Sequence, residues 1–205
     1  MDAIDAILED LDWRQAEFGA AKILLGTTVT KTQEEFLLRA AWSLLYAHYE
    51  GFVKRSLDYY YAHLSSIIPS CRDLPQSMKL FAMAAHIKKI RNAANNGFLD
   101  VVENFCNSDM ASPPVFPKVD AKSNLHLDIL TEFLDVAGID RNVIYKKNET
   151  LKILVDRRND IVHGDRELVA SIDAYLSTEK VVYDLMFDLA IAIEERIKYY
   201  KAMFQ

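Results

Sequence analysis

The sequence contains few glycines, prolines and cysteines. Its 205 residues include six Gly and five Pro, and the scarcity of these helix-breaking residues argues against a turn-rich fold and favours long helices. The two cysteines, Cys71 and Cys106, lie far apart and form no CxxC pair. A disulfide framework is therefore not expected, and the free thiols indicate a reducing compartment.

Several signals of membrane, cofactor and metal chemistry are also missing. No apolar run is long enough to cross a bilayer, and the acidic segment 1–13 lacks the basic start of a secretory signal. The sequence therefore predicts a cytoplasmic protein with no membrane partner. It has no GxxxxGK or GxGxxG phosphate loop and no HxxxH or HExxH pair. We therefore expect neither a cofactor nor a metal ion.

Acidic residues outnumber basic ones, by 30 to 24, which gives a net charge of −6. A broad basic surface of the kind that coats nucleic acid is therefore not expected. A local basic cleft stays compatible with this balance, because an acidic body would repel non-target RNA. The densest basic cluster, residues 88–91 (KKIR), is either a solvated helix face or a contact for RNA phosphates.

Apolar residues recur at steps of three and four, which predicts an all-α fold. We expect helices over residues 2–24, 33–67, 76–94, 98–106, from 123 or 124 to 137, from 148 or 150 to 163, and over 178–203. The proline-rich segment 107–122 is interpreted as a loop insertion within a single domain, residues 1–205, because neither side of it has a complete core pattern by itself. The expected architecture is a bundle of four to five long helices with short additional helices.

The helix expected over 33–67 carries the clearest core stripe. Thr32 and Glu35 match a capping box at its start. The stripe consists of Ala41, Leu45, His48 and Phe52. His48 is interpreted as a satisfied core histidine, and Gly51 is expected to permit a close helix crossing or a slight bend.

Residues 157–164, RRNDIVHG, concentrate polar and ionisable side chains at the end of an expected helix. Asn159 and His163 lie four residues apart and share a helix face, and the long Arg158 side chain can reach the same pocket. Gly164 is expected to end the helix. The helix dipole then favours the imidazolium form of His163.

The same helix needs an apolar anchor. We expect four residues to fix it in the core: Ile153, Leu154, Ile161 and Val162. By spacing alone, a structural role of Arg and His near a helix C-terminus is favoured over catalysis, because both residues complement the helix dipole.

These residue types nevertheless fit RNA cleavage without a metal. A neutral histidine can take the proton from a ribose 2′-hydroxyl, and a charged one can give it to the leaving 5′-oxygen. A guanidinium can hold two phosphate oxygens and stabilise the charge that develops at phosphorus. Because one histidine cannot act as base and acid at once, a two-fold dimer would supply the second copy.

The run RRNDIVHG resembles the signature of the HEPN superfamily, in which an Arg and a polar residue precede a His. Here four residues separate Arg158 from His163. Residues 44–54, LLYAHYEGFVK, resemble the early long helix of stand-alone HEPN proteins of bacterial conflict and defence loci, the RiboL-PSP/MAE-like branch. The resemblance implies a HEPN-like helical bundle and a homodimer whose cleft joins both copies of the motif.

The resemblance also implies a function and its residues. It implies a metal-independent endoribonuclease of the toxin or phage-defence type that leaves 2′,3′-cyclic phosphate ends, with an antitoxin or defence-complex protein as a possible partner. It assigns three catalytic residues: Arg158, His163 and Asn159. Three further residues are candidates for contacts with the RNA substrate: Arg157, Asp160 and Glu50.

Two alternatives stay open. In the first, the chain is a non-catalytic HEPN module that binds RNA, a nucleotide or a partner protein in a defence or toxin–antitoxin complex. In the second, it is a helical interaction protein without a nucleic-acid role. Some HEPN toxins carry a Tyr two residues after the His, which a nucleotidyltransferase antitoxin modifies. Asp165 occupies that position here, so control by this route is not expected.

Overall fold

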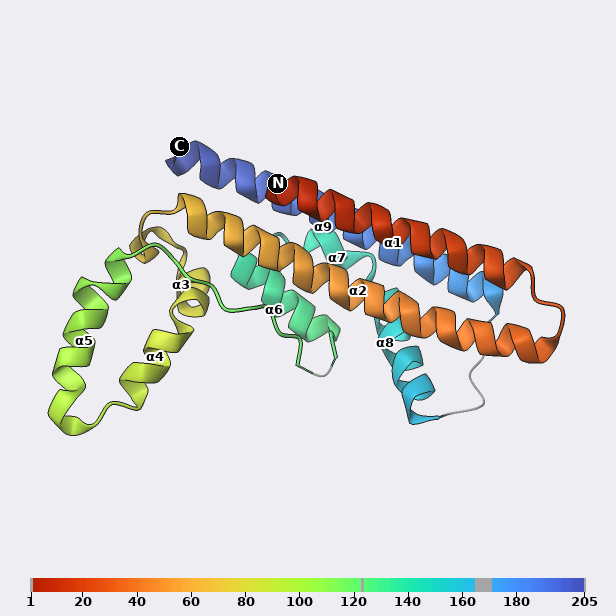
Figure 1. The fold of residues 1–205 in the computed structure, drawn as a ribbon, viewed down its shortest axis with the longest axis horizontal. Coiled ribbons are helices and arrows are strands. Elements are labelled where there is room, and N and C mark those ends of the chain that lie inside the picture. The colour runs from red at the N-terminus through yellow and green to blue at the C-terminus, as the bar shows by residue number, and fades with distance from the viewer. Residues whose placement is uncertain (1, 123, 165–170, 205) are drawn as a thin grey trace.

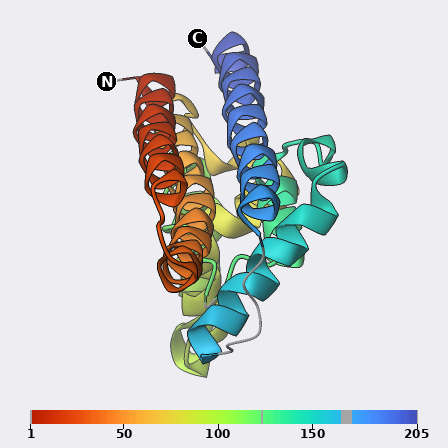
Figure 2. The same cartoon turned by 90° about the vertical axis from the view of Figure 1, so that its right-hand side faces the viewer.

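Three long helices form the frame of the molecule. The computed structural model describes residues 2–122, 124–164 and 171–204, and these ranges contain nine α-helices and no strand. The all-α prediction is therefore confirmed. Helices α1 (Ala3–Gly26), α2 (Lys31–Ile67) and α9 (Ile172–Phe204) lie side by side along the long axis (Figures 1 and 2).

Shorter elements lie on one side of this frame. In chain order they are the 3-10 turn η1 (Cys71–Asp73), α3 (Gln76–Ala82), α4 (Ala84–Arg91), the turn η2 (Asn95–Gly97), α5 (Phe98–Asn107), the turn η3 (Asp109–Ala111), α6 (Leu127–Ala137), α7 (Asn142–Tyr145) and α8 (Asn148–His163). Helix α8 packs against α2, α6 and α9, and α3 packs against α6. Helices α4 and α5 form an arm that extends away from the frame (Figure 1).

The expected helix starts were wrong in three places, one of which is α6, which begins at Leu127 instead of 123 or 124. The capping box of α2 uses Thr30 and Gln33 instead of Thr32 and Glu35, because Thr30 is the residue with extended backbone that accepts the Gln33 N–H. Both pairs fit the sequence pattern, and the earlier one starts the helix at Lys31. Helix α9 begins at 172, six residues before the expected start.

The helix expected over 76–94 was also wrong, because the chain divides at Met83. No Gly or Pro interrupts the sequence there. Met78, Ala82 and Met83 are buried, whereas no residue of α4 is buried. The chain therefore turns where its apolar anchor ends. Gly138, by contrast, adopts a left-handed conformation (φ 68°) and ends α6 as expected.

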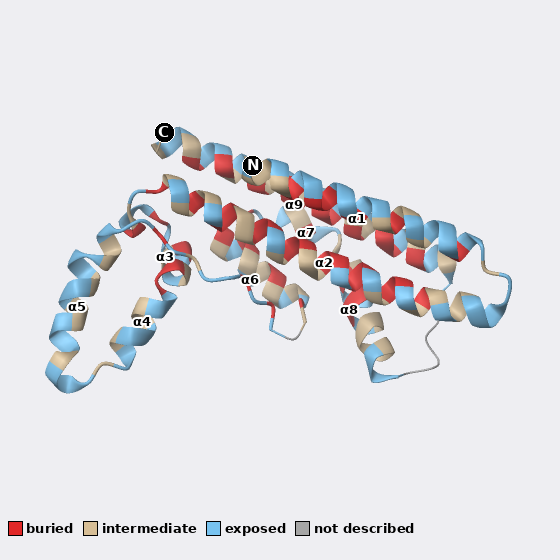
Figure 3. Ribbon diagram, viewed as in Figure 1, coloured by how far each residue is buried: buried red, intermediate tan, exposed pale blue. Residues whose placement is uncertain are grey.

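The core runs along the inner faces of the three long helices (Figure 3). The stripe of Ala41, Leu45, His48 and Phe52 is fully buried, so the prediction for this face is confirmed. Tyrosine hydroxyls in the core reach backbone oxygens. Tyr60, for example, donates to the carbonyl of residue 137 at 3.0 Å. Such bonds remove the penalty of burying a phenol.

A buried ion cluster joins α1 to α2. The Arg14 guanidinium donates to Asp10 at 2.8 Å and to the His48 carbonyl at 3.0 Å, and its Nη1 lies 3.1 Å from His48 Nδ1. Arg55 also donates to Asp10, at 2.8 Å. Arg14 is only 3% exposed, so this network supplies the hydrogen bonds that its burial requires.

Gly51 makes room for this guanidinium. A Cβ atom at position 51 would lie 3.2 Å from both Nη1 and Nη2 of Arg14. The group that approaches Gly51 is therefore a buried arginine side chain, and the close helix crossing or slight bend expected at this glycine stays a prediction. His48 is buried as expected, and its Nε2 lies 3.0 Å from Glu17 Oε2.

No helix within the described ranges combines the length and the apolar character that a membrane span requires.

The first prediction concerns the ion cluster. Arg14→Met should lower the free energy of unfolding by about 3 kcal/mol, because it leaves buried Asp10 with only Arg55 as an ionic partner. Urea unfolding followed by circular dichroism measures the change. Lys198→Met, which breaks an exposed pair with Glu194, is the matched control and should cost less than about 1 kcal/mol. Equal effects of the two variants would contradict a structural role of the cluster.

The second prediction concerns pH. Burial, and next the nearby Arg14 charge, lower the pKa of His48, and these effects outweigh the opposing influence of Glu17 and Asp10. The unfolded chain therefore binds a proton more readily than the folded chain. The resulting stability is fully present above the ordinary histidine pKa of about 6.5 and is lost as pH falls towards the folded pKa.

Unfolding measured between pH 7.5 and 5 should show this loss, with a slope of up to about 1.4 kcal/mol per pH unit. The slope should decrease in His48→Asn. The half-buried His63, whose pKa burial also lowers, provides the comparison. If His48→Asn keeps the wild-type slope while His63→Asn removes it, the assignment to His48 is wrong.

Candidate functional site

The motif occupies the end of α8, where the helix leaves the core. The first half of α8 is anchored by Leu151, Leu154 and Val155, which are buried. None of residues 156–164 is buried. The final turns of α8 project beyond the frame (Figures 1 and 2). The polar motif is therefore positioned by the first half of its helix.

Two of the four expected anchors were wrong. Leu154 is buried, and Ile161 is half-buried against the core, as expected. Ile153 is 48% exposed and Val162 is 61% exposed. Val162 lies in the second half of α8, which extends beyond the frame. Ile153 lies in the first half but two residues from Leu151, about 200° around the helix from that buried side chain.

Arg158 lies over an aromatic ring of α2. Its guanidinium carbon is 5.1 Å from the centre of the Tyr46 ring, within the range of a cation–π interaction. Its Nη1 donates to Asn159 Oδ1 at 3.1 Å. A guanidinium has five N–H donors, and a single one is engaged within the described residues. Arg158 is thus held in place with most of its donors available to a ligand.

Asn159 connects the motif to the segment before α6. Its Oδ1 accepts a second hydrogen bond, from Asn124 Nδ2 at 3.1 Å. The Asn159 side chain therefore positions the neighbouring Arg158, and it makes no hydrogen bond to His163. Asn124 lies 35 residues earlier in the chain, so sequence spacing gave no sign of this contact.

Tyr46 lies beneath the motif, and its hydroxyl group contacts three other residues. Its hydroxyl donates to Glu50 Oε2 at 2.6 Å and accepts the backbone N–H of Leu125 at 2.7 Å. Asn124 Oδ1 lies farther away, at 3.4 Å, and the single hydroxyl proton goes to the closer carboxylate. Burial first, and next the bond to Glu50, raise the pKa of Tyr46 far above its ordinary value. The phenol is therefore a proton donor at every physiological pH.

Glu50 acts on the motif only through this tyrosine. It contacts Tyr46 and lies 3.6 Å from Lys54, and it has no hydrogen bond or ion pair with Arg158 or His163. A carboxylate at the phenol hydroxyl makes the ring face more negative, which strengthens its attraction for Arg158. Tyr46 and Glu50 are four residues apart on one helix, which is the sequence signal that would have revealed the pair.

His163 is the last residue of α8 and is exposed. Gly164 follows in a left-handed conformation (φ 84°), and its N–H bonds to the carbonyls of Asp160 and Ile161. The expected helix end is therefore confirmed. Within the described parts of the chain, the imidazole has no hydrogen-bond or ion-pair partner.

The other candidates lie on the same stretch of α8. Arg157 and Asp160 are half-buried, and their side chains have no ion pair with any described residue. They flank the Arg158–Asn159 pair without joining its hydrogen-bond network. Asp165 lies outside the described residues.

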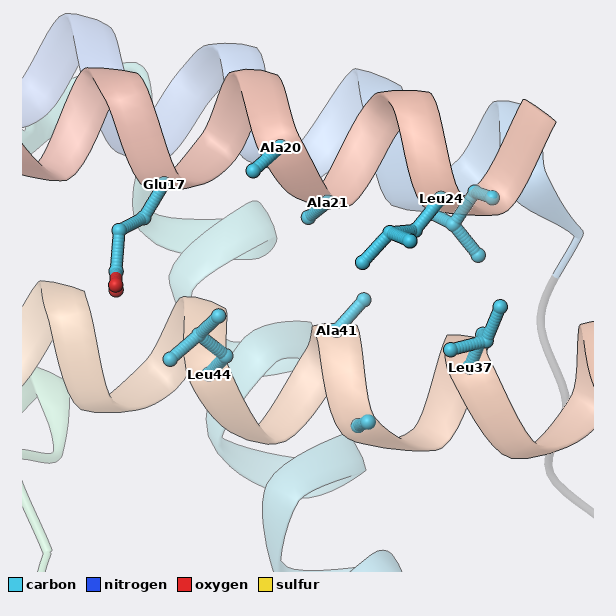
Figure 4. A pocket seen from close by; sticks show the side chains of 9 residues that line it. Glu17, Ala20, Ala21, Leu24, Leu37, Ala41 and Leu44 are labelled. Carbon is cyan, nitrogen blue, oxygen red and sulfur yellow. The ribbon is translucent and has the colours of Figure 1, made fainter. Parts of the chain in front are cut away.

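A groove elsewhere has different chemistry. About 190 Å³ of space lies between α1 and α2, and a single carboxylate, Glu17, points towards it (Figure 4). The other lining residues are apolar: Ala20, Ala21, Leu24, Leu25, Leu37, Ala40, Ala41 and Leu44. One carboxylate among alkyl groups offers no acid–base pair and no anion-binding group. The polar cluster on α8 is therefore the candidate site.

Metal chemistry has no visible support in the described ranges, because no group of three His, Cys, Asp or Glu side chains there is arranged to hold an ion. The site instead offers a preorganised guanidinium, a carboxamide and an imidazole. Guanidinium binds phosphate, and imidazole transfers protons near neutral pH. The arrangement is suited to a phosphate ester.

The comparison with known families gives a match along almost the whole chain. The sequence model of the MAE_28990-like HEPN family matches residues 3–202. No curated protein and no solved structure matches the chain.

The third prediction tests the hydrogen bonds of the Tyr46 hydroxyl. Tyr46→Phe should lower the free energy of unfolding by about 1–3 kcal/mol, because the buried N–H of Leu125 loses its acceptor. The aromatic ring beneath Arg158 is kept. Tyr199→Phe, at a half-exposed position with no hydrogen bond from its hydroxyl, is the control and should change stability by less than about 0.5 kcal/mol. Thermal and urea unfolding of the wild type and of the two variants measure these changes in stability.

Proposed function

Because the chain belongs to the MAE_28990-like HEPN family, we propose that it is a metal-independent endoribonuclease acting as a homodimer. Membership of this family supports an RNA-related function in general. The observation that carries the finer proposal is the arrangement at the end of α8. There Arg158 is held by Tyr46 and Asn159, and His163 is exposed, without a partner among the described residues.

The proposed roles follow from the contacts. Arg158 binds the scissile phosphate and stabilises the charge that develops on its oxygens. Asn159 positions Arg158 through their 3.1 Å hydrogen bond. His163 transfers protons. Arg157 and Asp160, on the same helix segment, contact the flanking parts of the RNA, and Glu50 acts through Tyr46.

The reaction proposed is an internal transesterification. The ribose 2′-oxygen loses its proton to a neutral imidazole and forms a bond to phosphorus. The bond from phosphorus to the 5′-oxygen breaks, and a protonated imidazole supplies the proton that this oxygen needs. The products are a 2′,3′-cyclic phosphate and a 5′-hydroxyl. Protons balance, and no metal takes part.

Two imidazoles are needed at the same moment, which is the reason for proposing a dimer. A two-fold axis beside the end of α8 pairs His163 with its own copy. Val162, next to His163, is 61% exposed. An exposed apolar side chain beside the motif suits burial against a second copy. The composite site then contains two copies of the R-x4-H motif.

The biological setting follows from the family resemblance. We propose a toxin or phage-defence role in the cytoplasm, with an antitoxin or a defence-complex protein as partner. The single-domain organisation, with residues 107–122 as an insertion, belongs to the same proposal. The alternative is a HEPN module that binds RNA, a nucleotide or a protein without cleaving it.

The fourth prediction is the decisive one for catalysis. His163→Ala should reduce cleavage of a mixed RNA pool in EDTA by about 10²- to 10⁴-fold, because the proton transfers lose their catalyst. Stability should stay unchanged, since His163 is exposed and has no partner in the described part of the chain. Lys152→Ala, an exposed change on the same helix, is the control and should retain activity. Light scattering checks that each variant has the same oligomeric state.

The outcome separates the alternatives. Cleavage by the wild type and not by His163→Ala supports the nuclease. The new 5′ ends of the RNA fragments should then carry a hydroxyl. RNA binding without cleavage in either protein supports the binding module. Full activity of His163→Ala would overturn the assignment of the histidine.

A further inference from the structure

An arm made of α4, η2 and α5, residues 84–107, extends from the frame. None of its residues is buried (Figures 1 and 3). An element with no buried side chain contributes little to the stability of the core. The arm is therefore free to be used for contact with another molecule, and its chemistry indicates which kind.

Acidic residues are absent from the α4 side of the arm and from its root, whereas α5 carries Asp100 and Glu103. Residues 74–99 contain no Asp or Glu, in a chain where 30 of 205 residues are acidic. The same stretch contains Lys79, Lys88, Lys89 and Arg91, a charge of +4, while the whole chain carries −6. The rest of the chain therefore carries −10. The arm itself, residues 84–107, carries +1, because Asp100 and Glu103 offset two of its three cations, so the positive face is limited to α4.

Three of these cations have no internal partner. Lys88, Lys89 and Arg91 are exposed, and none forms an ion pair with a described residue. Many other cations of the chain are paired, such as Lys54 with Glu50 and Lys147 with Asp188. Lys88 and Arg91 are three residues apart and share one face of α4. An unpaired basic face suits a polyanion.

The tip of the arm adds groups that recognise bases. Asn92, Asn95 and Asn96 are exposed, and their carboxamides can donate to and accept from base edges. Phe98 is 42% exposed at the start of α5. An exposed aromatic ring beside basic residues is the combination with which proteins stack unpaired bases.

We propose that the α4–α5 arm binds single-stranded RNA. Lys88, Lys89 and Arg91 contact phosphates, and Phe98 stacks on a base. Single strands are favoured over duplexes, because the deep, narrow major groove of A-form RNA hides its bases. The arm and the end of α8 project from the same side of the α1–α2–α9 frame, towards opposite ends of its long axis (Figures 1 and 2). The inference rests on the proposed function and adds a recognition site distant from the motif.

The test measures binding separately from cleavage. A fluorescein-labelled 20-nucleotide oligouridylate is titrated with the full chain carrying His163→Ala, in EDTA, by fluorescence anisotropy at 50 and 200 mM salt. In this background K88Q/K89Q/R91Q should bind about tenfold more weakly at 50 mM salt. The slope of log affinity against log salt should become shallower by about 2, since each phosphate contact on a single strand contributes about 0.7.

A matched control removes the same charge elsewhere. K31Q/K180Q/K198Q neutralises three exposed lysines on α2 and α9 and should keep the affinity of the background protein. Glutamine has a helix propensity close to that of lysine. Circular dichroism and unfolding curves should therefore match for both triple variants.

A second variant tests stacking. Phe98→Ala should weaken binding of the oligouridylate about tenfold and leave the slope against salt unchanged, because it removes a ring and no charge. Binding of a duplex RNA of equal length should not change. An equal loss for single-stranded and duplex RNA would overturn the stacking role.

The outcomes distinguish this inference from the proposed nuclease. Arm-dependent binding without any cleavage by the unmodified protein supports the arm and overturns the nuclease. Cleavage by the unmodified protein, together with arm variants that bind as tightly as the control, supports the nuclease and overturns RNA binding by the arm. The RNA assignment is also overturned if the protein binds no RNA, or if polyglutamate of equal length competes as well as unlabelled RNA.

Discussion

The fold depends on the burial of one charged side chain between its first two helices. Arg14 satisfies its hydrogen bonds with Asp10 and with the ring and carbonyl of His48, and a Cβ atom at residue 51 would crowd its guanidinium at 3.2 Å. A buried guanidinium is costly unless it is fully paired. The requirement therefore fixes how α1 lies on α2, and this pair in turn receives α9.

Helix α2 connects this constraint to the candidate site. His48 and Gly51 meet Arg14 of α1, while Tyr46 and Glu50 reach Arg158 of α8. Because these α2 residues are neighbours on one rigid helix, the packing that orders the cluster also sets the position of the ring beneath the arginine. The site therefore takes its precision from a buried helix, although the motif itself is hardly buried.

The proposed catalytic motif and the proposed RNA-binding arm both lie in parts of the chain that are not buried. The motif occupies the final turns of α8, and the arm of residues 84–107 has no buried residue. Exposed elements make few demands on packing, so their side chains can be chosen for binding. The negative charge of the body, with the positive charge gathered on α4, would direct a polyanion towards the arm and away from the remaining surface.

The sequence by itself determined the helical class, the stripe through His48, and the helix ends at Gly138 and Gly164, because periodicity and left-handed glycines act locally. The spacing of Arg158 and His163 in the motif could also be recognised in the sequence.

Only the tertiary structure decided what surrounds that motif. The contacts of Arg158 with Tyr46 and of Asn159 with Asn124 join residues far apart in sequence, and no local pattern encodes them. The exposure of Val162 had the same origin, since an apolar residue is buried only if another element covers it. Local rules fix which residues share a helix face, whereas the crossing of the helices fixes what that face meets.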